Sequence, residues 1–321
     1  GRSLACCGSR RGIVSNVDNV DNVDNVGNVI NVINIINVIN GKMTTQPAFL
    51  GSWLVSEYVY NSDGAFAGIV RQRRELRRRQ DGDLDVIQTC VPGPELAGHP
   101  MAEFSGERIF TLRVDGRARR YLGPEVIGNG LGWGEGALTG RGVWPRFGHN
   151  FTSFSVMPAP DRQITGGQFF NAGERIANIV GLAIPEAPGA DYPTFSGHTW
   201  PGAVASRWQG ARRRVDRSGT VLDEIPVARE YAGSERYHEP DFEVSFRARG
   251  ARLAIAGTLN GIARRAGWML EGTGVAGSDA VDFIDVFDPQ GGNLISVRRW
   301  TRDELLHRME AAGEVEADEF P

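Results

Sequence analysis

The sequence has few cysteines, no long apolar run and no excess of basic charge. Its cysteines are Cys6, Cys7 and Cys90, and two of them lie near the N-terminus, so a framework of internal disulfides is not expected. This usage favours a reducing compartment, and we expect a cytoplasmic protein. No stretch of about 18 apolar residues is present, so no membrane-spanning helix is predicted. The net charge of −4 argues against binding to nucleic acid, because nucleic-acid-binding proteins are usually basic.

The sequence motifs of several common sites are also absent. There is no Cys-x-x-Cys pair and no His-Glu-x-x-His, so we predict no metal site. The segment His238-Glu239-Pro240-Asp241 offers an imidazole and two carboxylates, but a metal needs further converging ligands, and we interpret the segment as a surface loop. No Gly-x-Ser-x-Gly elbow occurs, and the glycine-rich run at 128–132 lacks the strand-then-helix context of a dinucleotide site. We therefore predict no cofactor.

The N-terminal segment is of low complexity. Asn-Val-Asp and related triplets repeat from residue 16 to residue 40, a period that fits neither a helix nor a strand. A stacked or self-associating segment is one interpretation, and an unstructured tail is the one we favour. Because Met43 resembles a natural start, residues 1–42 are expected to lie outside the mature protein.

What the sequence has in abundance is glycine, with 42 residues, and short alternating apolar segments. Glycine at this level is typical of tight turns and bulges, and so of a β-rich protein. Strands are predicted one after another from residue 50, joined by turns such as 61–64 and 115–116. The arginine-rich strand at 66–79 is expected to turn Arg71, Arg73, Arg77 and Arg79 to solvent on one outer face.

The same pattern continues after a proline-rich stretch, which we interpret as a linker. A helix is predicted near the C-terminus, where Thr301 and Glu304 form a capping box and Leu305, Leu306 and Met309 form an apolar stripe. The predicted fold class is all-β, with two consecutive antiparallel barrel-like domains and a short C-terminal helix. The expected boundaries are a tail at 1–46, a first barrel at 47–186, a linker at 187–203, a second barrel with the helix at 204–313 and an acidic tail at 314–321.

The two halves share an internal similarity. Asn129-Gly130 precedes Gly132-Trp133, and Asn260-Gly261 precedes Gly267-Trp268; an aromatic strand follows in each half. A real repeat implies two similar barrels or one merged sheet, whereas chance likeness between glycine-rich segments implies neither.

The head of the first strand, Gly51-Ser52-Trp53, resembles the calycin superfamily of lipocalins, fatty-acid-binding proteins and nitrobindin-like barrels. The resemblance implies a tryptophan that closes one end of a barrel, covered by an arginine from a late strand, for which Arg175 and Arg298 are the candidates. No enzymatic motif accompanies it.

The densest unusual segment runs from Trp144 to Phe151. Barrel mouths admit ligands, so we predict that Arg146 holds an anionic group and that His149 acts as a catalytic acid or base. The alternative is a packed rim. The predicted ligand-binding set is Trp133, Trp144, Arg146, Phe151, Phe154, Phe169 and Phe170.

The leading functional hypothesis is binding of a small apolar or amphipathic molecule in a barrel cavity. The alternatives are a cofactor-independent isomerase, cyclase or hydratase using the same pocket, and a haem-binding barrel with a histidine ligand. Oligomeric state and ligand identity are left open by the sequence.

Overall fold

The computed structural model describes residues 49–132, 136–194, 206–216, 221–232, 236–239, 242–249, 252–288, 293–302 and 305–316. The predictions for the low-complexity segment, for Trp133 and for linker residues 195–203 lie outside the described residues.

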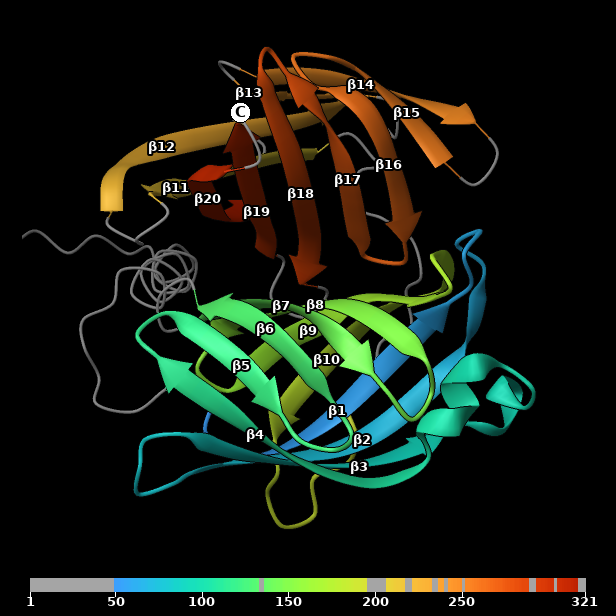
Figure 1. Ribbon diagram of the computed structural model, residues 1–321. Coiled ribbons are helices and arrows are strands. Elements are labelled where there is room, and N and C mark those ends of the chain that lie inside the picture. The colour runs from blue at the N-terminus through green and yellow to red at the C-terminus, as the bar shows by residue number, and fades with distance from the viewer. Residues whose placement is uncertain are drawn as a thin grey trace, which may run out of the picture.

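The first half of the chain folds into a closed barrel of ten antiparallel strands, and each strand pairs with its neighbours in sequence. The first and last strands close the barrel, with Trp53 opposite Pro185. Figure 1 shows this barrel in blue to yellow-green. Its strands are β1 (Gly51–Tyr60), β2 (Phe66–Arg78), β3 (Leu84–Pro92), β4 (Gly106–Asp115), β5 (Ala118–Leu122), β6 (Ile127–Gly132), β7 (Ala137–Trp144), β8 (His149–Ala159), β9 (Arg162–Asn171) and β10 (Glu174–Pro185).

The second half forms another closed barrel with the same strand order, drawn in orange to red in Figure 1. Its strands are β11 (Ser206–Val215), β12 (Val221–Ala232), β13 (Arg236–Glu239), β14 (Phe242–Arg249), β15 (Arg252–Gly257), β16 (Asn260–Ala266), β17 (Met269–Ala276), β18 (Asp279–Asp288), β19 (Asn293–Arg302) and β20 (Leu305–Glu316). The all-β, two-barrel prediction is confirmed. The matched segments Asn129-Gly130 and Asn260-Gly261 lie in β6 and β16, the sixth strand of each barrel.

The predicted C-terminal helix is wrong, because Leu305–Glu316 is the strand β20. This strand pairs with β19 on one side and with β11 on the other. A capping box and an apolar stripe stabilise a helix by only a few kcal/mol. A strand that completes two ladders satisfies the backbone groups that would otherwise leave β11 and β19 as open edges.

Side-chain alternation explains the interior of the first barrel. On β2, Arg71, Arg73 and Arg77 are exposed as predicted, while the intervening residues Gln72 and Arg74 face inward. The β2–β3 and β3–β4 ladders continue this inward row with apolar side chains, which gives the barrel a largely apolar lining.

Two short 3₁₀ helices, η1 (Pro94–Leu96) and η2 (Pro100–Phe104), connect β3 to β4 and cover one end of the first barrel. Leu96, Met101 and Phe104 from this segment are buried in the barrel core. We refer to residues 94–104 as the cap.

A third apolar cluster joins the two barrels. It contains Tyr58, Val180 and Leu182 from the outer face of the first barrel and Trp268 and Met269 from the second. The indole of Trp268 meets the Tyr58 ring edge-on, with centroids 5.8 Å apart. Val180 and Leu182 of β10 therefore pack between the barrels, and the alternate residues Ala177, Ile179 and Ala183 face the interior.

Within the described residues, no helix is long and apolar enough to cross a membrane.

Candidate functional site

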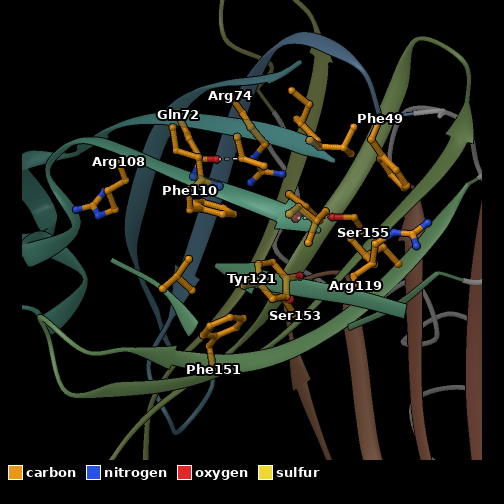
Figure 2. Close-up of a pocket in the computed structure, with 18 of the residues that line it drawn as sticks. Phe49, Gln72, Arg74, Arg108, Phe110, Arg119, Tyr121, Phe151, Ser153 and Ser155 are labelled. Carbon is orange, nitrogen blue, oxygen red and sulfur yellow. Dashed lines mark hydrogen bonds between the residues drawn. The ribbon is translucent and has the colours of Figure 1, made fainter. Parts of the chain in front are cut away.

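The interior of the first barrel contains a cavity of about 480 Å³ (Figure 2). Such a volume lies within the range of small-molecule sites, about 300–1,000 Å³. Strands all round the barrel and the cap contribute to its wall. The apolar part of the wall includes Phe49, Val70, Leu76, Leu84, Val86, Met101, Phe104, Phe110, Leu112, Val114, Val126, Ala137, Leu138, Trp144, Phe151, Phe169 and Ile179.

A polar group on β1, β2 and β9 interrupts this apolar wall. The Nη2 atom of Arg74 lies 3.3 Å from a carboxylate oxygen of Glu57, and its Nε donates to Gln72 at 2.8 Å. Arg74 also donates through Nη1 to the side-chain oxygen of Gln163 at 3.3 Å. Figure 2 shows Gln72 and Arg74 together on the cavity wall. All four side chains therefore form one hydrogen-bonded cluster centred on Arg74.

Burial controls the titration of this part of the wall. It raises the pKa of Glu57 above its ordinary value, and the opposing attraction of Arg74 does not cancel the effect. Burial likewise raises the pKa of Cys90 to about 11, so this thiol stays protonated at neutral pH. The charged form of the Glu57 carboxyl is thus less favourable on the cavity wall than in water.

Arg108, on β4, lies at the capped end of the cavity, away from Arg74 (Figure 2). Its side chain is 3% exposed, and its guanidinium carbon lies 5.1 Å from the ring centre of Phe104 and 5.3 Å from that of Phe147. Its Nη2 donates to the Ser105 carbonyl at 3.2 Å. Among the described residues, its Nε and Nη1 atoms have no hydrogen-bond partner. A buried cation with free donors is costly unless something accepts from it.

His149 lies close to the same aromatic rings. Its imidazole is buried at 3% exposure and stacks on Phe104 and Phe147, with centroids 6.1 and 6.4 Å away. Neither ring nitrogen has a hydrogen-bond partner among the described residues. Although it lies close to these rings, His149 is not among the described residues that line the cavity.

The structure distributes the predicted binding residues over three environments. Trp144, Phe151 and Phe169 lie on the cavity wall. Phe154 points the other way and packs in the cluster between the barrels, because its neighbours in the alternation face inward. The role of Trp144, Phe151, Phe154 and Phe169 in binding a ligand stays a prediction.

Arg146 and Phe170 are also away from the wall residues. Arg146 is exposed and lies over the ring of Phe147, at 5.6 Å. Phe170 contacts Arg175, whose guanidinium carbon is 5.5 Å from its ring centre. Arg175 is not a cover for Trp53 but forms an ion pair with Glu271 of the second barrel.

Sequence reasoning missed three polar wall residues: Glu57, Arg74 and Arg108. Each occupies an inward position of its strand: Glu57 has apolar neighbours on that row, Arg74 lies between Gln72 and Leu76, and Arg108 precedes Phe110. Glu57 lies between Val55 and Val59, which are both in the barrel core. The detectable signal was a single charged residue at an inward position within an alternating apolar row.

The second barrel contains a buried charged network in place of a wholly apolar interior. Of the segment interpreted as a surface loop, His238 and Glu239 lie in the strand β13, Pro240 and Asp241 lie outside the described residues, and Glu239 is 1% exposed. Arg229 donates to Glu239 at 2.9 Å, Arg298 does so at 3.1 Å, and Arg212 forms a further ion pair. Arg298, the other candidate cover for Trp53, therefore belongs to this network. Among the described residues, no cluster of His, Cys, Asp and Glu is arranged to hold a metal ion.

Comparisons with known proteins support the fold. No protein-family model matches the chain, and no curated protein matches it in sequence. The chain shares its two-barrel fold with a protein of unknown function from the DUF3598 family of Nostoc punctiforme. The two are 10% identical with a TM-score of 0.55, over 84% of this chain and 97% of that one. An S-type phycobiliprotein lyase from Guillardia theta aligns with a TM-score of 0.35 at 9% identity, over 46% of this chain and 96% of the lyase.

Proposed function

We propose that the first barrel binds a small amphipathic molecule, with its apolar body in the cavity and a hydrogen-bond-accepting or anionic group at Arg108. The single observation that carries this proposal is the cavity of about 480 Å³ inside the barrel with an under-partnered arginine on its wall. A calycin-like relationship is part of the proposal. Trp53 and Trp208 support it, since each is buried at the third position of the first strand of its barrel.

The wall supplies two kinds of interaction. Apolar burial contributes about 25 cal/mol for each Å² removed from water, before the costs of association. Arg108 contributes orientation, because its two free donors gain an acceptor only when the ligand's polar group lies at the capped end. A charge-assisted hydrogen bond of this kind is worth about 1.5–3 kcal/mol.

The test is displacement of a fluorescent probe from the full chain. The probe is 1-anilinonaphthalene-8-sulfonate, and the competitors are decanoate and decanol, which share a chain but differ in charge. We expect decanoate to compete about tenfold better than decanol, and Arg108→Met to remove most of that difference. Native mass spectrometry of the freshly purified protein provides a second readout, through any co-purified small molecule.

A cavity-filling variant separates the cavity from surface binding. Ser155→Phe places an aromatic ring on the cavity wall. The ring should occupy space that the probe needs and so abolish probe binding. The matched control is Ser245→Phe, an exposed position on β14 of the second barrel, which should leave binding unchanged. Probe binding that survives Ser155→Phe in a folded protein would refute the proposal.

A second function is favoured by Glu57. A carboxyl group on a cavity wall whose pKa is raised by burial is a candidate to exchange a proton with a bound substrate. The isomerase, cyclase or hydratase alternative therefore depends on Glu57 more than on His149, and turnover that is lost in Glu57→Gln with probe affinity kept would support it. The haem alternative lacks the histidine ligand that it requires, since no histidine is among the described wall residues.

A further inference from the structure

A second hollow lies between the two barrels, with a volume of about 470 Å³. The outer faces of β6 to β10 form one side and those of β16 to β19 form the other, where the barrels meet in Figure 1. We call it the inter-barrel cleft. It is a different hollow from the proposed ligand cavity, which lies inside the first barrel, although Thr152 and Ser153 on β8 border both.

The cleft carries an excess of positive charge. Its arginines are Arg141, Arg175, Arg264 and Arg299, and its acidic residues are Glu271 and Asp282. Two guanidinium charges therefore have no carboxylate to balance them within the cleft.

The acidic side chains are already committed or poorly placed for the remaining arginines. Glu271, which is 5% exposed, accepts from Arg175 and Gln168 of the other barrel. Asp282 is an exposed residue directly opposite Arg299 in the β18–β19 ladder. Neither acidic residue forms an ion pair with Arg264 or Arg141 among the contacts of the described residues.

Among the described residues, Arg264 and Arg141 donate hydrogen bonds to neutral groups, and Glu271 attracts Arg264 only through space. Arg264 donates through Nη1 to the Ser62 carbonyl of the first barrel at 2.6 Å. Arg141 donates through Nε to the side-chain oxygen of Asn129 at 3.4 Å. Burial and the nearby charge of Arg175 lower the pKa of Arg264, so its environment disfavours a cation that lacks a counter-ion. A bound anion would relieve this unfavourable state.

The rest of the cleft can hold an organic body. Hydroxyl and amide side chains on both barrels supply further hydrogen-bonding groups, and apolar side chains cover the remaining wall. The polar members are Asn129, Thr139, Thr152, Gln168 and Thr273, and the apolar members are Leu131, Ile262, Ile284 and Val297.

We propose that the inter-barrel cleft is a binding site for a small organic anion with at least two negative charges, held chiefly by Arg264 and Arg141. The charge excess of the cleft matches such a ligand, and the guanidinium groups suit phosphate and carboxylate oxygens alike. The site does not depend on the ligand of the barrel cavity. It also bridges the barrels, so its occupant stabilises their arrangement.

Isothermal titration calorimetry of the full chain at low ionic strength tests the proposal. The probes are inorganic pyrophosphate, citrate and, as a monovalent comparison, acetate. We expect pyrophosphate or citrate to bind at least about tenfold more tightly than acetate, and binding to weaken as salt is added. Preference for pyrophosphate would assign a phosphate-bearing ligand, and preference for citrate a polycarboxylate.

Variants locate the site. Arg264→Gln and Arg141→Gln should each weaken polyanion binding by about tenfold or more. Arg299→Gln should weaken it too, and this variant guards against loss of folding because Arg299 is exposed. The control Arg247→Gln removes an exposed arginine from β14, outside the cleft, and should change nothing.

Two further results separate this site from the barrel cavity. Arg108→Met should leave polyanion binding intact, and Arg264→Gln should leave displacement of the fluorescent probe intact. The proposal is overturned if neither polyanion binds better than acetate. It is also overturned if Arg247→Gln weakens binding as much as Arg264→Gln does.

Discussion

Replacing Glu239 by glutamine should strongly destabilise the second barrel. Glu239 is 1% exposed and accepts from Arg229 and Arg298, which are 0% and 2% exposed. Arg229 also pairs with Asp285 at 3.1 Å. The substitution keeps the size of the side chain but leaves three arginines with one carboxylate fewer. Removing one partner of a buried ion pair costs about 3–5 kcal/mol, and we expect a loss in that range.

The pH dependence gives the prediction a second readout. Burial acts to raise the pKa of Glu239, but Arg298, Arg229 and Arg212 outweigh it and hold the pKa well below the ordinary glutamate value of 4.5. A lowered pKa in the folded state means stabilisation that is complete above pH 4.5 and is lost as the pH falls towards the folded-state pKa. The difference between wild type and Glu239→Gln should thus be constant at neutral pH and shrink in acid.

Urea unfolding followed by tryptophan fluorescence and circular dichroism measures both effects. The matched control is Glu243→Gln on the adjacent strand, whose ion pair with Arg236 spans 4.0 Å between side chains that are 58% and 62% exposed. An exposed pair contributes about 0–1 kcal/mol, so the control should be nearly neutral. Equal losses for the two variants, or a Glu239→Gln loss that is the same at pH 3 and pH 7, would contradict the reasoning.

Three further predictions concern the interface, the cavity and the backbone. Trp268→Ala and Trp208→Ala should each cost about 3–5 kcal/mol, but only Trp268→Ala should split urea unfolding into two transitions, because Trp268 packs between the barrels. Glu57→Gln should raise the stability of the folded protein more at pH 8 than at pH 4. The raised folded-state pKa of Glu57 means that its contribution to stability is lost as the pH rises, whereas glutamine does not titrate. An equal effect at both pH values in thermal melts would refute this. Gly167→Ala should destabilise far more than Gly116→Ala in chemical denaturation, since a Cβ at Gly167 would overlap the Thr152 carbonyl whereas Gly116 has open space.

The strand content and the tandem arrangement were predictable because both leave local signals. Alternating apolar residues and Gly-containing turns mark each strand, and Asn129-Gly130 and Asn260-Gly261 mark corresponding strands of the two barrels. The strand β20 was not predictable in the same way. Its local sequence favours a helix, and only the unpaired edges of β11 and β19, far apart in sequence, favour a strand.

The cavity was predictable in kind but only partly in its residues. Trp144 and Phe151 lie on the cavity wall because the aromatic-rich segment enters an inward row, and Phe169 reaches the wall from β9; their part in binding stays a prediction. Phe154 was misplaced because an aromatic residue fits an apolar interface as well as an apolar interior, and the position of the second barrel is not a local property. Arg108 was overlooked because a lone arginine in a strand usually faces solvent.

The closing pairs β1–β10 and β11–β20 have a consequence for how the chain reaches its native state. Every other pairing joins consecutive strands and needs only a hairpin or a short connection. Each closing pair brings together the two ends of its barrel, so it carries the largest loop-closure entropy in that barrel. We therefore expect the hairpins to form early and the seam to form last, as the slow step of folding. The first and last strands of each barrel are neighbours at this seam. A linker could therefore join their ends, and a circularly permuted barrel could begin and end at one of the other loops.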